Sequence, residues 1–222
     1  MKNKDMEYQK AINYIIDLIK DGKLVVGSKI PSERDIAEII GIGRSSIREA
    51  ISILRGMGLI ESRHGSGNYI AKDCNKAIKQ MIEVMLALGS ITYKDVLEFR
   101  RVISQAVCKI LLAENNIDEE TISDILDKMH NADTKELATL DYLFHIKLIN
   151  ATKNSLFITI MEAIAGVYLS TIVMINQKMN DDDRKEFIEI HSKIYESIIN
   201  KDEEKCMYYL KQHYDLTENK LM

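Results

Sequence analysis

The sequence predicts a mainly α-helical protein, with a helix-turn-helix and a short β-hairpin in its N-terminal part and a C-terminal all-helical bundle of about six or seven helices. The 222 residues include one proline and ten glycines, which argues against an all-β or loop-rich chain. Hydrophobic residues make up 46% of the chain, which is enough for a buried core and too much for a disordered protein. Apolar side chains recur at helical spacing over most of the length.

Charge divides the chain into two parts. Residues 1–72 contain twelve Lys and Arg against nine Asp and Glu, a net charge of +3, although the whole chain has a net charge of −4. Residues 73–222 are therefore distinctly acidic, and such asymmetry suggests two parts with different partners. We expect a first domain over residues 1–72, a polar linker over 73–77 and a helical domain over 78–222.

The first part predicts three helices. Apolar side chains form one stripe over residues 6–21, and Gly22 follows as a stop signal. A second helix starts after Ser32, whose hydroxyl can cap the free amides of the first turn, and a third starts at Arg44. Only residues 41–43 separate the second helix from the third, and two short helices joined by such a glycine-containing turn form a helix-turn-helix.

A short β-hairpin and a series of helices complete the chain. Residues 59–63 and 68–71 bracket a glycine-bearing tip, which predicts the hairpin. The further predicted helices are 78–88, 93–113, 119–131, 135–152, 156–177, 183–200 and 202–219. Polar residues interrupt the apolar stretch from Ser155 to Met174, so we expect no membrane span, and we expect no export signal. Three cysteines without metal-ligand spacing favour a reduced, cytoplasmic setting.

The helix that starts at Arg44 carries a basic face. At about 100° per residue, Arg44, Arg48 and Arg55 lie on neighbouring positions beside an apolar stripe. An arginine can bond guanine through two hydrogen bonds in the major groove. The hydroxyls of Ser45 and Ser46 and the free amides of the helix start suit phosphate oxygens.

The hairpin tip adds a second basic element. Residues 63–67 could enter an adjacent groove, where glycines allow the backbone to approach DNA closely. The alternative is a solvated basic face on a small helical domain. Because the helix-turn-helix, the basic second helix and the basic tip follow one another, we expect this part to bind double-stranded DNA.

These residues resemble the GntR family of regulators. Residues 27–37 are similar to its pG-x-x-LPSEReLA signature, residues 43–50 to its SRtpVReAL helix start, and residues 58–70 to its closing wing. The resemblance implies a winged helix-turn-helix. The residues that it places on DNA are Arg34, Arg44, Arg48, His64 and Gly65. Gly43 departs from the family, which usually has Ser or Thr there, and a phosphate contact at this position does not carry over.

Four titratable residues in the second part lie where apolar residues are expected. Asp141 and His145 are one turn apart on one predicted helix, and His191 and His213 each share a stripe with apolar side chains. Burying an unpaired polar group costs about 1–3 kcal/mol, so these groups need partners. One carboxylate and three imidazoles suit a divalent metal ion, Zn²⁺ first, with Ni²⁺ and Mn²⁺ as alternatives. Asp141 and His145 alone could instead form a hydrogen-bonded pair within the helix.

Arg100 is the fifth polar residue on an apolar stripe. It shares that stripe with Val96, Ile103 and Val107, so its guanidinium should point inward and needs an anion. The anion is either an internal carboxylate or a carboxylate or phosphate of a ligand, and position alone leaves both readings open.

The second part is similar to the FCD effector domain of FadR-type GntR regulators. Residues 98–100 match its Glu-x-Arg, and the Asp141/His145 pair with the two later histidines matches its Asp-x-x-x-His pattern. The resemblance implies a helical bundle that binds a divalent metal with a small organic acid beside it. Ser104 stands where the family often has Glu, so the identity of the ligand does not carry over.

Taken together, these features predict a ligand-responsive transcriptional regulator and not an enzyme. We expect a homodimer that binds a palindromic operator and a small carboxylate effector, with repression relieved by the effector as the default direction. One alternative is a metal-dependent enzyme tethered to a DNA-binding module. Four candidate ligands leave it little open coordination, and no separate general base accompanies them. The other is a metal-free acyl-ligand sensor whose histidines are hydrogen-bonded within the core.

Overall fold

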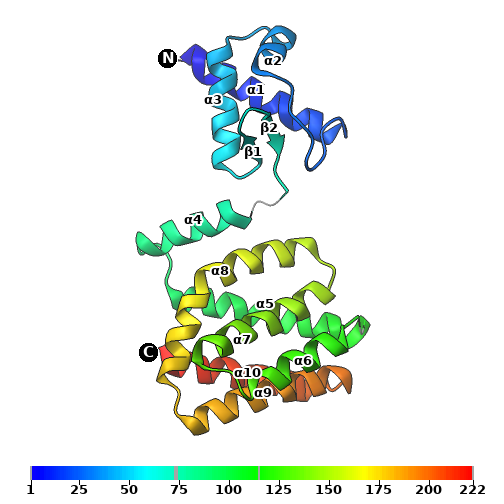
Figure 1. The fold of residues 1–222 in the computed structure, drawn as a ribbon, viewed down its shortest axis with the longest axis vertical. Helices are drawn as coiled ribbons and strands as arrows, with labels where there is room; N and C mark the ends of the chain where they lie inside the picture. Colours follow the sequence, from blue (N-terminus) through cyan, green and yellow to red (C-terminus); the bar gives the residue numbers. More distant parts are fainter. Residues whose placement is uncertain (1, 73–74, 115, 222) are drawn as a thin grey trace. The chain divides into compact units, whose positions relative to one another are not determined.

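The computed structural model describes residues 2–72, 75–114 and 116–221, in which ten helices and one two-stranded sheet form two compact units (Figure 1). The first unit comprises residues Met1–Ile78 and the second Lys79–Met222. The predicted fold class, mainly α with an N-terminal helix-turn-helix and hairpin and a C-terminal helical bundle, is confirmed. Each unit has its own hydrophobic core.

The first unit consists of three helices and a two-stranded antiparallel sheet. Its elements are α1 (Lys2–Lys20), α2 (Glu33–Ile40), α3 (Arg44–Gly56), β1 (Ile60–Arg63) and β2 (Gly67–Ile70). Helix α1 packs against both α2 and α3, and α3 also packs against β1. The apolar stripes of the three helices meet in the core, which includes Ala11, Ile12, Ile15, Ile36, Ile47, Ile51 and Leu54.

Local side-chain and backbone chemistry sets the turns of this unit. The Ser32 hydroxyl accepts from the Asp35 amide and the Asp35 carboxylate accepts from the Ser32 amide, so α2 begins with a capping box. Gly41 ends α2 in the left-handed conformation, with φ of 68°. The hairpin turns at Gly65, where φ is 69°. The amide of Ile30 donates to the carbonyl of Asn68 at 2.9 Å, which ties the hairpin to the chain before α2.

The second unit is a bundle of antiparallel and crossing helices that agrees closely with the predicted ranges. The helices of the C-terminal part are α4 (Asn75–Ala87), α5 (Tyr93–Glu114), α6 (Glu119–Met129), α7 (Thr134–Ala151), α8 (Ser155–Lys178), α9 (Asp181–Ile199) and α10 (Glu203–Leu221). The most extensive helix pairs are α9 with α10, α7 with α8, and α5 with α10. Helix α4 begins inside the expected linker, which is therefore helical from Asn75 onward. The domain boundaries remain a prediction.

Helix α8 contains the apolar stretch from Ser155 to Met174, which was expected not to span a membrane. By length and composition alone it is long and apolar enough to do so, with a mean hydropathy of 1.9. In the structure α8 is a core helix of the bundle, packed along α7, and side chains such as Met161, Tyr168 and Ile175 are buried. Its high apolar content therefore reflects contacts with several neighbouring helices, and one such helix is weak evidence for a membrane.

Candidate functional site

The first candidate site is the exposed basic surface of the helix-turn-helix and hairpin. The structure leaves six of the predicted DNA-contacting residues exposed, and these are Arg34, Arg44, Ser45, Arg48, His64 and Gly65. Arg44 and Ser45 lie in the first turn of α3, and His64 and Gly65 lie at the turn between β1 and β2. Exposure of these groups meets the first requirement for contact with a nucleic acid.

Ser46 does not lie on that surface. It is 1% exposed, and its hydroxyl donates to the Glu7 carboxylate of α1 at 2.9 Å. This hydrogen bond joins α3 to α1, and the hydroxyl is not accessible to solvent. We therefore withdraw Ser46 from the predicted phosphate contacts, because its side chain faces the interior of the unit.

Arg48 is held by an ion pair within the helix-turn-helix. Its guanidinium lies 3.1 Å from the Glu33 carboxylate at the start of α2, and 68% of the arginine side chain is exposed. Water screens a pair as exposed as this one, so the guanidinium can exchange Glu33 for a DNA acceptor at small cost. At the other end of the turn, Gly43 caps α3 without any side-chain hydrogen bond.

The second candidate site is a buried cluster that joins three helices of the bundle. Asp141 and His145 come from α7, His191 from α9 and His213 from α10, and they are 2%, 5%, 0% and 2% exposed. One ligand atom from each residue lies within 4.8 Å of the others. The structure therefore brings together the four residues that the sequence singled out from three separate stripes.

The spacing of the donor atoms suits a metal ion. The Asp141 Oδ1 atom lies 3.0 Å from Nε2 of His191, 3.5 Å from Nε2 of His145 and 3.8 Å from Nε2 of His213. The Nε2 atoms of His145 and His213 are 3.0 Å apart. Zinc bonds of about 2.0–2.1 Å at tetrahedral angles separate neighbouring ligand atoms by about 3.3 Å. The observed distances lie on either side of this value.

The tautomer of His191 gives a second argument for a cation in the cluster. Its Nδ1 lies 2.7 Å from the carbonyl oxygen of Phe187, and because a carbonyl only accepts, Nδ1 must carry a hydrogen. In the neutral ring the Nε2 lone pair then faces Asp141 Oδ1 at 3.0 Å, and two acceptors at that distance repel each other. Either a proton or a metal ion between them removes this repulsion. The Phe187 carbonyl is the kind of outer partner that orients metal-ligating histidines.

The electrostatics of the cluster favour the ligating forms of the other groups. Burial alone would raise the pKa of Asp141, but the facing His145 and His191 hold that pKa well below its usual range. Burial lowers the pKa of His145 although Asp141 opposes the shift. Burial and the neighbouring His191 and His145 lower the pKa of His213 well below its usual range. These directions favour an ionised carboxylate at Asp141 and neutral imidazoles at His145 and His213, the forms that bind metal ions.

Arg100 of α5 reaches the same carboxylate from its other side. Its guanidinium is buried, and one terminal nitrogen lies 3.8 Å from Asp141 Oδ2, while Oδ1 faces the imidazoles. Of the two anions that the sequence allowed for Arg100, the internal carboxylate is therefore present, and it is Asp141. The guanidinium keeps a donor that this contact does not satisfy, because its Nε has no hydrogen-bond partner among the residues that the structure describes.

Tyr168 is a residue of this region that the sequence did not single out. The Arg100 guanidinium lies over its ring, 4.6 Å from the centroid, and the tyrosine is 1% exposed. An aromatic residue on the apolar stripe of α8 is indistinguishable in sequence from an ordinary core residue. Its role becomes visible only when the packing of α8 on α5 is known.

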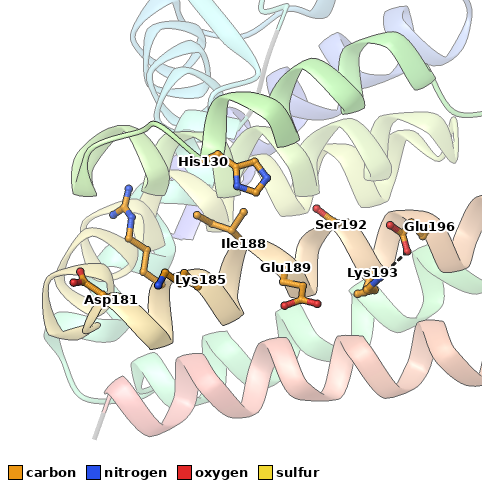
Figure 2. Close-up of a pocket in the computed structure, with 9 residues that line it drawn as sticks. His130, Asp181, Lys185, Ile188, Glu189, Ser192, Lys193 and Glu196 are labelled. Carbon is orange, nitrogen blue, oxygen red and sulfur yellow. Dashed lines mark hydrogen bonds and ion pairs between the residues drawn. The ribbon is translucent and has the colours of Figure 1, made fainter.

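A surface pocket along α9 is lined by none of the residues of this cluster. It measures about 670 Å³ and lies beside His130. Its lining combines acidic Asp181 and Glu189 with basic Lys185 and Lys193 (Figure 2). Such mixed charge gives no preference for an anion. Among the described cysteines Cys108 and Cys206 are free and buried, while Cys74 lies outside the described residues.

A much smaller cavity lies next to the cluster. It is lined by Ser104, Cys108 and His145, among others, and measures about 10 Å³. A single water molecule needs about this much space, so the cavity has no room for an organic acid. The Ser104 hydroxyl is itself hydrogen-bonded to the Tyr214 hydroxyl at 2.7 Å.

Comparisons with known proteins agree with both units. Residues 7–70 match the family described as bacterial regulatory proteins, gntR family, and residues 95–216 match the FCD domain. The HTH-type transcriptional regulator LutR of Bacillus subtilis is 31% identical over 158 residues, which are 70% of this chain and 72% of that protein. The Glc operon transcriptional activator of Escherichia coli K12 is 26% identical over 192 residues, which are 82% of this chain and 76% of the activator.

A solved structure supports the same architecture. Streptococcus agalactiae GntR superposes with a TM-score of 0.67 at 22% sequence identity, over 96% of this chain and 99% of that one. At this level of identity the likeness shows the fold. The arrangement of a helix-turn-helix followed by a helical bundle is thus one that other chains of similar length adopt.

Proposed function

The chain belongs to the gntR family of bacterial regulatory proteins and carries an FCD domain, and we propose on this basis that it is a cytoplasmic homodimer that represses transcription until a small carboxylate binds. Membership in the family makes it a ligand-responsive transcriptional regulator that binds DNA through its helix-turn-helix, and not an enzyme. The effector, the metal, the homodimer and the direction of regulation belong to the proposal.

The DNA contacts that we propose use the exposed set and omit Ser46. Arg44 and Arg48 would enter the major groove from α3, with Ser45 at a phosphate, and His64 and Gly65 would enter an adjacent groove from the hairpin. Arg34 at the start of α2 completes the set. A homodimer would present two such surfaces to the two halves of a palindromic operator.

The metal part of the proposal depends on one observation, the convergence of Asp141 Oδ1 and three imidazole Nε2 atoms in a buried cluster. Asp141, His145, His191 and His213 would hold the ion, for which Zn²⁺ suits the donor set best, with Ni²⁺ and Mn²⁺ as alternatives. When bound, the ion supplies a positive centre that attracts a carboxylate. Arg100 would bind the same carboxylate, because its Nε remains without a partner among the described residues.

The size of the adjacent cavity supplies a physical reason for regulation. A cavity of about 10 Å³ cannot accept an organic acid, so binding requires the helices around His145 to move apart. The acid would then bind one arrangement of the bundle better than the other, and only such a difference can shift operator affinity. A coupling free energy of about 1–3 kcal/mol is sufficient for this response.

Metal analysis of protein purified without chelators tests the proposal. We expect about one equivalent of a divalent metal per chain in the wild type and a large loss in His191→Ala, which removes the ligand whose tautomer is fixed by Phe187. Less than about 0.2 equivalents in the wild type, unaffected by His191→Ala, would contradict a metal centre, since ligation would then be absent. His130→Ala, outside the cluster, serves as the matched control.

A metal-free sensor is the second candidate, and one observation favours it. The cluster already contains close polar contacts at 3.0 Å between Asp141 and His191 and between His145 and His213. Protons shared along these contacts could replace the ion. The same metal analysis separates the two candidates, because a proton network leaves no metal in the purified protein.

A further inference from the structure

Two buried polar atoms beside the metal-binding cluster have no partner within the described ranges, and they belong to residues in contact with each other. One is Nε of Arg100 on α5, and the other is the hydroxyl oxygen of Tyr168 on α8. Arg100 is 4% exposed and Tyr168 is 1% exposed, so bulk water does not compensate for the missing hydrogen bonds. An unsatisfied buried polar group costs about 1–3 kcal/mol, which makes two of them in contact a feature that calls for a ligand.

The packing of the two side chains fixes the arginine in one orientation. The guanidinium lies over the Tyr168 ring at 4.6 Å from its centroid, and one terminal nitrogen faces Asp141 Oδ2 at 3.8 Å. The ring and the carboxylate together hold the arginine from two directions. An arginine immobilised in this way loses little further rotamer freedom when it binds an anion.

We propose that Tyr168 is a second effector-binding residue, whose hydroxyl donates a hydrogen bond to the same carboxylate that Arg100 binds. This inference rests on the proposed function and deepens it, because it assigns a residue to the acid site that the sequence pattern of the metal ligands does not include. The tyrosine thus has two roles: its ring orients the guanidinium, and its hydroxyl contacts the ligand.

The chemistry of the two unpartnered groups defines the class of ligand. A guanidinium N–H only donates, so a contact of Arg100 with the Tyr168 oxygen leaves the hydroxyl hydrogen free. Burial raises the pKa of Tyr168 well above its usual range although Arg100 opposes the shift, so the hydroxyl stays protonated and available as a donor. Two donors and a positive charge select an anion with acceptor oxygens, such as a carboxylate. They offer nothing to a ligand whose polar groups are only donors or cations.

Conservative substitutions at two buried tyrosines form the test. Tyr168→Phe removes the unpartnered hydroxyl and keeps the ring under Arg100. Tyr214→Phe is the matched control, since Tyr214 is also 1% exposed but its hydroxyl is hydrogen-bonded to Ser104. Both variants, the wild type and Arg100→Gln are loaded with Zn²⁺ and titrated with acetate and with succinate, with thermal stabilisation and calorimetry as readouts.

The proposal predicts opposite effects of the two substitutions. Tyr168→Phe should weaken carboxylate binding about tenfold, with the zinc content unchanged and the melting temperature of the ligand-free protein equal or higher, because an unsatisfied hydroxyl is removed. Tyr214→Phe should lower the melting temperature and leave the carboxylate affinity within about twofold, since it loses an internal hydrogen bond instead.

The outcomes distinguish this inference from the proposed function. Carboxylate affinity that falls in Arg100→Gln but stays within about twofold in Tyr168→Phe overturns the role of Tyr168 and keeps the acid site, since a lost hydrogen bond to a charged group would weaken binding more. That result would mean that the hydroxyl is satisfied by a buried water molecule. A zinc-loaded wild type that binds neither acetate nor succinate overturns both this inference and the carboxylate effector.

Discussion

The two units of this protein place their functional polar groups in opposite environments. In the first unit, the arginines proposed for DNA are exposed, and even Arg48, which is paired with Glu33, has 68% of its side chain exposed. In the second, Asp141 and its histidine partners are at most 5% exposed, and Arg100 is 4% exposed. Exposed charges are solvated whether or not DNA is present, so their removal should affect binding and leave folding intact. Buried charges depend on one another, so the removal of any one affects the fold as well.

The largest effect in this comparison is expected from Asp141→Ala. The substitution leaves the buried guanidinium of Arg100 without its anion and the imidazoles without a carboxylate. Removing one partner of a buried ion pair costs about 3–5 kcal/mol, and we expect a loss of this size in the free energy of unfolding of the chelator-treated protein. Urea denaturation followed by circular dichroism measures it.

A surface aspartate provides the control for Asp141. Asp124 pairs with Lys128 at 2.6 Å, and more than half of each side chain is exposed, so Asp124→Ala should change the free energy of unfolding by about 1 kcal/mol or less. Equal and small losses in the two variants would show that the buried cluster does not depend on its carboxylate. The contrast between the units would then disappear.

The next largest effect is expected from Arg48→Ala, and it should appear in DNA binding alone. Loss of a base-contacting arginine costs about 1–3 kcal/mol, so affinity for operator DNA selected with the wild-type protein should fall about tenfold to a hundredfold. The free energy of unfolding should change little, because the lost Glu33 pair is exposed. Gel-shift titrations at several salt concentrations measure both the affinity and its salt dependence.

Lys20→Ala is a suitable control for Arg48, since it removes one positive charge at the end of α1, outside the proposed contact set. Its effect on operator affinity should be about twofold or less if position matters more than net charge. Equal effects of the two substitutions would indicate that DNA responds to the net charge of +3 and not to the geometry of α3.

The helices and the convergence of Asp141 with three histidines were predictable from the sequence for different reasons. The helices follow from apolar periodicity, and the predicted range 93–113 is found as Tyr93–Glu114. The cluster of Asp141 and the histidines follows from the cost of burying polar groups. Each of these residues lies on an apolar stripe and therefore needs a polar partner in the folded protein. In both cases each segment of the chain shows its own part of the signal, even though the four cluster residues come from three helices.

What the sequence did not reveal depends on contacts between distant segments. Ser46 adjoins exposed positions on the helix, and its burial follows from Glu7, which approaches from another helix. The anion beside Arg100 could be identified only when α5 and α7 were packed together. Tyr168 looks like any core aromatic until the guanidinium of Arg100 is found over its ring.

The smallest predicted effects concern two adjacent serines that reproduce the contrast between the units within a single helix. Ser45 is exposed and proposed for a phosphate, whereas Ser46 is buried and donates to Glu7. Ser46→Ala should cost about 1.5 kcal/mol of unfolding free energy, the lower end of the range for a hydrogen bond to a charged group, and leave operator affinity unchanged. Ser45→Ala should leave the unfolding free energy unchanged and weaken operator binding a few-fold. Urea denaturation and gel-shift titration of both variants provide the measurements.

If Ser46→Ala weakened DNA binding without a change in stability, Ser46 would have to turn outward in the complex, and the division between buried and exposed groups would fail at the start of α3.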